Sequence, residues 1–499
     1  MTIEIAFPSP VCYIGSMLKS LCMLLTAGAI AAAPLPLFAQ EADESFDEEA
    51  TARAEDHMNW WREAHFGMFI HFGLYSGLGG EFQGHPCGAE WTQNNLQMAS
   101  SFYAKEAMPL FKPAPNCAQQ WAMLAKAAGC RYVVLTSKHH EGFALFDTKT
   151  TDYSSQGLLG RDIIREFTEA CRENDLRVGF YHSVIDWHHP NYDYTIPSDL
   201  PYPKYQKEEL ELNKIPRNQQ AYIDYLHRQV EELTTKYGKV DILWWDYSAG
   251  EMQGDRAWKA TALMEKCRRN QPGIIMNNRL FAYSGLKNDQ AADEAAAAKH
   301  DEGDFITPEQ RVPEGGLDGQ DWESCMTVGR NWGYNRYDKE FKSPATVITT
   351  LEECVAKGGN LLLNINPRGD GSVPEEVADV FRRVGDWMGV NSEAIYGAAP
   401  VEGITLPEGV RMVSVWDTLY VYLPAQKPKG DTYALRIPAH ELDEVEPEIL
   451  GQPDCDITVQ RLELPGEEEP EAWMQFLIPT TAWDDAVEGI PVLRFGFGG

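Results

Sequence analysis

The sequence predicts an α/β fold, a (β/α)8-like barrel followed by a small antiparallel β-sandwich. Strand-like apolar runs alternate with amphipathic helix-like runs between Phe66 and Asn366. After about Gly397 the helical periodicity disappears, and short alternating runs separated by Pro, Gly and acidic turns take over. No G-x-G-x-x-G motif follows the first strand-like run, which argues against an open dinucleotide-binding sheet.

Composition sets the broad class of the protein. The chain has 499 residues, 43% of them hydrophobic and 11% aromatic, which is enough for a large globular core. Its formal net charge of -32 disfavours nucleic acid and anionic membranes as partners, because both would repel it. The ten cysteines show no C-x-x-C spacing, which argues against a zinc ribbon or a redox motif.

The amino-terminal region resembles an export signal. Residues 1–39 read as a signal peptide in which Lys19 precedes the apolar stretch 21–33, and Met17 is the expected true start. Residues 40–55 are acidic and unpatterned, as in a flexible linker. We therefore expect an exported protein, periplasmic or extracellular, with no membrane attachment once the leader is removed.

Two domains follow, a catalytic barrel over residues 56–396 and a β-sandwich over residues 397–499. Apolar stripes at helical spacing predict helices around 121–128, 163–171 and 222–233. Residues 283–301, rich in Ala and acid, read as an inserted surface loop. The barrel strands are expected at 66–72, 131–136, 176–182, 240–246, 273–279 and 360–366.

Polar residues follow the ends of the predicted strands, where a buried strand does not otherwise tolerate them. These residues are His71, His139, His140, Tyr181, His182, Asp246, Asn278 and Arg279. A single histidine at a strand end is more often structural, but several that converge on one rim of a barrel indicate a site. Glu90–Trp91, Trp332 and other tryptophans add flat aromatic faces, and such faces with neutral donors suit a sugar.

Hydrolysis of a glycoside needs two carboxyl groups. Asp246 closes the apolar run L-W-W-D and is the candidate for the group beside the anomeric carbon. Glu309 and Glu323 are the candidates for the acid, and both are expected on a long loop after the fifth strand. We favour Glu323, because Trp322 and Cys325 give it the more apolar setting, which raises a carboxyl pKa.

Eight motifs in order resemble the α-L-fucosidases of glycoside hydrolase family 29 over residues 55 to 400. They are F-G-M-F-I-H-F-G-L-Y-S (66–76), E-W (90–91), S-K-H-H-E-G-F-A-L-F (137–146), T-D-Y (151–153), G-F-Y-H-S-V-I-D-W-H-H-P (179–190), L-W-W-D (243–246), W-G-Y-N (332–335) and G-G-N-L-L-L-N-I-N-P (358–367).

This resemblance implies an exo-acting, retaining double displacement on terminal α-L-fucose, with Asp246 as nucleophile. It leaves the acid/base open between Glu323 and Glu309. It also implies a substrate-binding pocket, a fucosylated oligosaccharide or glycoconjugate as substrate, and no metal or cofactor. The implied substrate-binding residues are His71, Glu90, Trp91, His139, His140, Tyr181, Arg279 and Trp332.

Two alternatives are a metal-dependent hydrolase and a catalytically inactive sugar-binding protein. The pairs His139–His140 and His188–His189 suggest metal ligands, but adjacent residues on a strand point to opposite faces, and no third ligand has suitable spacing. The presence of Asp246 and of two glutamates that could serve as the acid argues against a catalytically inactive protein. The oligomeric state, including a homo-oligomer, stays open.

Overall fold

The computed structural model describes residues 57–192, 216–248, 252–281, 303–317, 319–439, 445–464 and 471–497. The predicted signal peptide and acidic linker, and the predicted insertion at 283–301, lie outside the described residues, so export stays a prediction. Within the described part of the chain, no helix has the length and apolar character needed to cross a bilayer.

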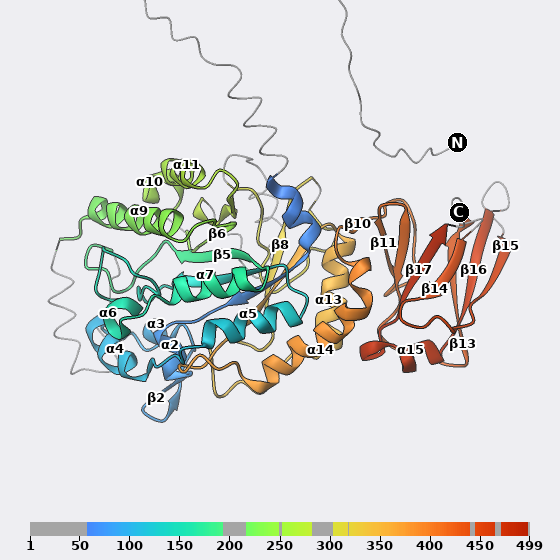
Figure 1. The fold of residues 1–499 in the computed structure, drawn as a ribbon, viewed down its shortest axis with the longest axis horizontal. Helices are drawn as coiled ribbons and strands as arrows, with labels where there is room; N and C mark the ends of the chain where they lie inside the picture. The colour runs from blue at the N-terminus through green and yellow to red at the C-terminus, as the bar shows by residue number, and fades with distance from the viewer. Residues whose placement is uncertain are drawn as a thin grey trace, which may run out of the picture. The chain divides into compact units, whose positions relative to one another are not determined.

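The main sheet has seven parallel strands in the order β7-β6-β5-β4-β1-β9-β8, and Figure 1 shows helices packed along it. The strands are β1 (Phe66–Ile70), β4 (Tyr132–Lys138), β5 (Arg177–Ser183), β6 (Ile242–Asp246), β7 (Ile275–Met276), β8 (Glu323–Thr327) and β9 (Asn360–Ile365). All strand pairs in this sheet are parallel, so their carboxyl ends share one edge. The predicted barrel-type α/β fold is confirmed.

A further segment lies between the two edge strands β7 and β8. Residues 304–309 run parallel to both and make isolated bridges to each. The amide of Asn278 donates to the carbonyl of Phe305 (3.1 Å), and the amide of Glu323 donates to the carbonyl of Ile306 (2.8 Å). This segment therefore occupies the eighth strand position of the barrel.

Five of the predicted strands agree closely with the structure, and the sixth is shorter. The expected strand at 273–279 is reduced to β7, because the chain turns into a short 3-10 helix, η2 (Asn278–Leu280). Strand β8 was not predicted at all. Its five residues include a glutamate, a serine and a threonine, so it lacks the apolar run by which the other strands were found.

Helices follow most strands and cover the sheet. The longer ones are α4 (Ser100–Ala107), α5 (Cys117–Ala127), α7 (Ile163–Glu173), α9 (Gln219–Lys236), α11 (Ala260–Asn270), α13 (Pro344–Ala356) and α14 (Glu375–Asn391). Helix α7 shows why they form. The Asp162 side chain accepts a hydrogen bond from the amide of Arg165 (3.0 Å) and caps the first turn. Ile163, Ile164 and Phe167 bury one face.

Shorter elements lie in the loops between these strands and helices. They are a helix over 57–64, α2 (Leu74–Leu78), the hairpin β2 (Glu81–Phe82) and β3 (His85–Pro86), α3 (Thr92–Asn95), η1 (Met108–Leu110), α6 (Ser155–Leu159), α10 (Gly254–Trp258) and η4 (Ser392–Ala394).

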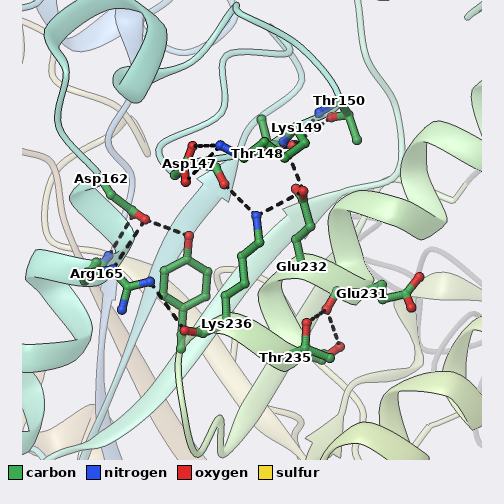
Figure 2. A network of polar contacts seen from close by, with 12 residues as sticks. Asp147, Thr148, Lys149, Thr150, Asp162, Arg165, Glu231, Glu232, Thr235 and Lys236 are labelled. Carbon is green, nitrogen blue, oxygen red and sulfur yellow. Dashed lines mark hydrogen bonds and ion pairs between the residues drawn. The ribbon is translucent and has the colours of Figure 1, made fainter.

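A polar network ties the end of α9 to the loop after β4 and to the start of α7 (Figure 2). The Lys236 ammonium donates to the carbonyl of Asp147 (2.9 Å) and to Glu232 (3.1 Å). The Tyr237 hydroxyl donates to Asp162 (2.8 Å), the same carboxylate that caps α7. This network anchors the two helices on either side of β5 and lies outside the pocket described below.

The last part of the chain is antiparallel. One sheet has the order β10-β11-β12-β17-β14 and the other the order β13-β16-β15. The strands are β10 (Ala399–Pro400), β11 (Arg411–Val415), β12 (Thr418–Tyr422), β13 (Thr432–Pro438), β14 (Val445–Ile449), β15 (Thr458–Leu464), β16 (Glu471–Pro479) and β17 (Val492–Phe497), with α15 (Thr481–Asp485) and η6 (Val487–Gly489) before the last. The two sheets share an apolar core, as expected of a β-sandwich.

The barrel interior has its own core of large side chains that point inward from the strands. It includes Phe69, Tyr132, Tyr181, Trp244 and Phe305. These side chains are buried and pack against one another, so they form the base on which a site at the carboxyl edge rests.

Candidate active site

The site begins at Asp246, the last residue of β6. The Tyr181 hydroxyl donates to its Oδ2 (2.7 Å), and the Arg279 Nη1 donates to its Oδ1 (2.9 Å). Burial alone would raise the pKa of Asp246, but the charge of Arg279, with contributions from His140 and Tyr181, holds this pKa below its ordinary value. Asp246 is therefore a fixed, ionised carboxylate at the end of a barrel strand.

Arg279 links Asp246 to a second carboxylate. Its Nη2 donates to Glu309 Oε2 (3.1 Å), and its Nε donates to the Thr307 hydroxyl (2.7 Å). The guanidinium also lies over the Trp244 ring, 4.5 Å from the ring centroid. The arginine side chain is 2% exposed, so these contacts fix a planar cation between two acids.

Three histidines lie on the same side of the pocket as neutral rings. Burial lowers the pKa of His71 and of His140 to about 4, and it also lowers the pKa of His139 well below its ordinary value. His71 Nδ1 is 2.7 Å from Asn364 Oδ1, and the Asn364 amide donates to the carbonyl of Trp332 (2.8 Å). This pattern puts the proton on Nδ1 of His71 and leaves its Nε2 as an acceptor.

The other two histidines come from the turn that follows β4. His140 Nδ1 is 2.7 Å from the Ser183 hydroxyl, and its Nε2 is 3.7 Å from Asp246 Oδ2. His139 Nδ1 is buried and has no hydrogen-bond partner within the protein. Neutral imidazoles that both donate and accept suit the hydroxyl groups of a sugar.

His139 and His140 lie side by side at the pocket, so the expectation that they point to opposite faces is wrong. Strand β4 ends at Lys138, so the two residues lie in a turn, and their ring centroids are 4.0 Å apart. Both line the pocket. Among the described residues, no group of three or more His, Cys, Asp or Glu side chains has the geometry to hold a metal ion.

These groups surround one cavity, whose empty space is about 380 Å³ when the solvent at its open mouth is included. Its lining residues are Phe69, His71, Trp91, His139, His140, Tyr181, Trp244, Asp246, Tyr247, Arg279, Glu309, Cys325 and Trp332. Most of these residues are buried and form the floor. Trp91, Tyr247, Glu309 and Trp332 are partly exposed and form the mouth.

Glu90, a predicted substrate-binding residue, does not line this cavity. Its Oε2 accepts a hydrogen bond from the amide of Gly333 (2.8 Å), directly after Trp332. Burial raises the pKa of Glu90 to about 7. The structure therefore makes Glu90 a buried support for the loop that presents the Trp332 ring, which lies 5.0 Å from the ring of His71.

Glu323 is not on a loop at the rim, and that expectation is wrong. It is the first residue of β8, at the amino end of the strand, opposite Asn360. Tyr132 and Trp244 donate hydrogen bonds to its two oxygens (2.5 and 3.1 Å), and the residue is 1% exposed. The Trp244 ring lines the cavity, so Glu323 supports the floor from beneath without lining the pocket.

Glu309 reaches the rim because of its register. It bridges to Cys325, the third residue of β8, whereas Ile306 lies beside Glu323 at the start of that strand. The segment 304–309 therefore carries Glu309 towards the carboxyl edge of the barrel, where Asp246 also lies. The predicted catalytic residues are thus separated: Asp246 and Glu309 come together, and Glu323 does not join them.

Several lining residues were not among the predicted site residues: Phe69, Trp244, Tyr247 and Cys325. The first two point into the barrel from strand interiors, where alternation of side chains places them beside strand-end groups. Tyr247 follows Asp246 directly, which was the available signal. Cys325 belongs to the strand that was not recognised, so sequence reasoning had no means of placing it.

The chain matches the alpha-L-fucosidase family over residues 36–393. Plasma alpha-L-fucosidase from Rattus norvegicus is 31% identical over 415 residues, which cover 79% of this chain and 82% of the rat protein. Alpha-L-fucosidase isoenzyme 1 from Paenibacillus thiaminolyticus superposes with a TM-score of 0.74 at 33% identity, covering 90% of this chain and all of that one.

A GH29 alpha-L-fucosidase from Bacteroides thetaiotaomicron superposes with a TM-score of 0.67 at 26% identity, covering 85% of this chain and 96% of that one. That structure is a trapped covalent intermediate in complex with 2-fluoro-fucosyl fluoride. The family match covers most of the sequence, and relatives and solved structures agree with it. This chain belongs to the α-L-fucosidases of glycoside hydrolase family 29 and is a glycoside hydrolase.

Proposed function

We propose that this protein is an exo-acting, retaining α-L-fucosidase in which Asp246 is the nucleophile and Glu309 is the general acid and base. One observation carries the proposal: the guanidinium of Arg279 contacts both carboxylates, at 2.9 and 3.1 Å. Because both carboxylates contact one buried, rigid cation, they are held close together, as a retaining mechanism with two carboxyl groups flanking one glycosidic bond requires.

In the first step, an Asp246 oxygen attacks the anomeric carbon of a terminal α-L-fucoside. The bond to the leaving oxygen breaks, and Glu309 gives that oxygen its proton. Arg279 and the Tyr181 hydroxyl keep Asp246 ionised and aligned before the attack. The product of this step is an ester between Asp246 and fucose, with inverted configuration at the anomeric carbon.

In the second step, Glu309, now a carboxylate, accepts a proton from water. The resulting nucleophile attacks the anomeric carbon from the opposite side and releases Asp246. Two inversions give net retention, and both carboxyl groups return to their starting protonation states. The covalent intermediate trapped in the Bacteroides thetaiotaomicron relative supports this two-step course.

The shape of the cavity supports terminal fucose as the unit that is bound. The floor is buried and has three neutral histidines, and among the described lining residues the partly exposed ones are at the mouth. A pocket closed at one end accepts a chain end and excludes the middle of a chain. We therefore assign fucosylated oligosaccharides or glycoconjugates as substrates, with His71, His139, His140, Tyr181, Trp91 and Trp332 around the fucose.

Azide rescue of two variants tests both roles at once. In Asp246→Gly, azide replaces the nucleophile and attacks the substrate directly, so the product should be β-L-fucosyl azide. In Glu309→Gly, azide attacks the covalent ester in place of water, so the product should be α-L-fucosyl azide. The anomeric configuration is read by proton NMR, with turnover of an aryl α-L-fucoside by the wild-type protein as the reference.

The Glu323→Gln variant is the matched control, because it keeps the fold of the barrel base while removing the carboxyl group. It should need no rescue and should form no fucosyl azide. If Glu323 variants, and not Glu309→Gly, gave α-L-fucosyl azide, the acid/base role would belong to Glu323. If Asp246→Gly kept near wild-type turnover, the nucleophile assignment would be lost.

A further inference from the structure

The residue after the nucleophile has an unusual backbone. Tyr247 has φ of 72°, in the left-handed region that an L-residue other than glycine adopts at a cost in free energy. Eight other non-glycine residues in the described part of the chain share this feature, and Tyr247 is the one that lines the catalytic cavity. Such strain at the edge of a site calls for a functional explanation.

The strained backbone places an aromatic ring at the mouth. The Tyr247 ring is 5.6 Å from the ring of Trp91 and 5.0 Å from that of His140. Trp91 in turn packs on Trp187 at 5.3 Å, and Trp187 is 5% exposed. Tyr247 and Trp91 therefore form an aromatic corner that is fixed from behind by Trp187.

The leaving group of the reaction must pass this corner. The floor is closed, and Glu309, which protonates the leaving oxygen, is itself a mouth residue. An aglycone attached to that oxygen therefore extends through the mouth. The C–H face of a sugar ring packs well on a flat aromatic ring, which supplies contact area without demanding a particular hydroxyl pattern.

We propose that Tyr247 is a specificity residue that stacks on the sugar ring of the aglycone and makes the enzyme prefer fucosylated sugars over fucosides without a ring in the leaving group. This inference rests on the proposed fucosidase function and adds the chemical class of the leaving group. The left-handed backbone at Tyr247 costs free energy, and the protein keeps it because this conformation directs the ring to the mouth.

Three variants separate the ring from the hydroxyl and the backbone. Tyr247→Phe keeps the ring, Tyr247→Ala removes the ring and keeps a side chain on the left-handed backbone, and Tyr247→Gly removes both the ring and the strain. Each is assayed on a fucosylated disaccharide and on α-L-fucosyl fluoride, whose leaving group has no ring. The readout is the ratio of kcat/KM on the two substrates.

We expect Tyr247→Ala and Tyr247→Gly to lower this ratio about tenfold relative to wild type, as expected for one aromatic contact, and Tyr247→Phe to leave it within about twofold. Tyr247→Gly should also melt at a higher temperature than Tyr247→Ala, because glycine adopts this φ freely. Together these results would support stacking on a strained residue.

Equal losses on both substrates in Tyr247→Ala and Tyr247→Gly would overturn the inference, because Tyr247 would then act only on the nucleophile. A fall in the ratio for Tyr247→Phe as large as that for Tyr247→Ala would overturn it as well, because the hydroxyl would be the recognition group. Failure of the wild-type protein to hydrolyse α-L-fucosyl fluoride would instead reject the proposed function itself.

Discussion

The two ends of the barrel each hold a glutamate, one partly exposed and one buried, and the two glutamates differ in their surroundings. At the carboxyl end, Glu309 faces a cavity and shares the guanidinium of Arg279 with Asp246. At the amino end, Glu323 accepts hydrogen bonds from Tyr132 and Trp244 and does not line this cavity. The comparison teaches that an apolar neighbourhood alone does not identify a general acid.

The pKa values make the same point. Burial raises the pKa of Glu323 to about 7, and it does the same to Glu90 and Glu141, none of which lines the cavity. A raised carboxyl pKa in this protein therefore reports burial. What distinguishes Glu309 is access to the substrate, which depends on which end of the barrel a residue occupies.

The largest expected effect comes from substitution of Arg279, which contacts Asp246 and Glu309 at the carboxyl end of the barrel. Arg279→Ala should lower kcat/KM about 1,000-fold, because the two carboxylates proposed as nucleophile and acid/base lose the cation that aligns them. Because Arg279 lowers the pKa of Asp246, its removal should raise that pKa. The acidic limb of the pH–kcat/KM profile should therefore move to higher pH, and an unmoved limb would contradict the assigned linkage.

The second prediction compares the two glutamates directly. Glu309→Gln should lose about 100-fold or more on a disaccharide and much less on an aryl fucoside with a good leaving group, because an activated phenolate needs little protonation. Glu323→Gln should lose less than about tenfold on both, since it only supports the Trp244 ring. Kinetics on the two substrates measure this, and a leaving-group effect confined to Glu323→Gln would reverse the comparison.

The third prediction is that Glu323, at the amino end of the barrel, contributes more to stability than Glu309 at the carboxyl end. Glu323→Ala should lower the free energy of unfolding by about 3 kcal/mol, because it opens a cavity and leaves the Tyr132 hydroxyl and the Trp244 indole nitrogen without their acceptor. Glu309→Ala should cost less than about 1 kcal/mol, because its side chain faces the open mouth. Urea unfolding of the two variants gives both values. Equal losses would mean that the two carboxyl groups are equally built into the fold.

The smallest effect is a pH dependence of stability. The pKa of Glu323 is raised in the folded protein to about 7 from an ordinary 4.5, so the folded state holds this proton after the unfolded state has released it. Stability from this group is therefore complete at low pH and falls as pH rises from 4.5 to 7. Between pH 5 and 6.5 the loss should be about 2 kcal/mol.

Glu323→Gln has no proton to release, so its unfolding free energy should fall less than that of wild type over the same interval. Other buried glutamates contribute the same slope to both proteins, so the difference isolates Glu323. Parallel curves for the two proteins would show that Glu323 is already ionised in the folded state.

Much of the fold and part of the site could be predicted without the structure. Strands β1, β4, β5, β6 and β9 are apolar runs with clear boundaries, and strands of one parallel sheet end at one edge. That is why Asp246, His71, His139, His140, Tyr181 and Arg279 were expected to converge, and they line one cavity. Local pattern was sufficient there because each of these residues is close in sequence to the end of a recognisable element.

Only the tertiary structure shows which of the two glutamates lines the cavity. Strand β8 has no apolar run, and the segment 304–309 is held by single bridges to its neighbours, so neither has a local signal. Their register against one another puts Glu323 at the base and Glu309 at the rim. By itself the sequence determined which residues are available for catalysis and which strand ends gather them. Which carboxyl group reaches the cavity depended on strand pairing between distant segments, because hydrogen bonds across the sheet set that position.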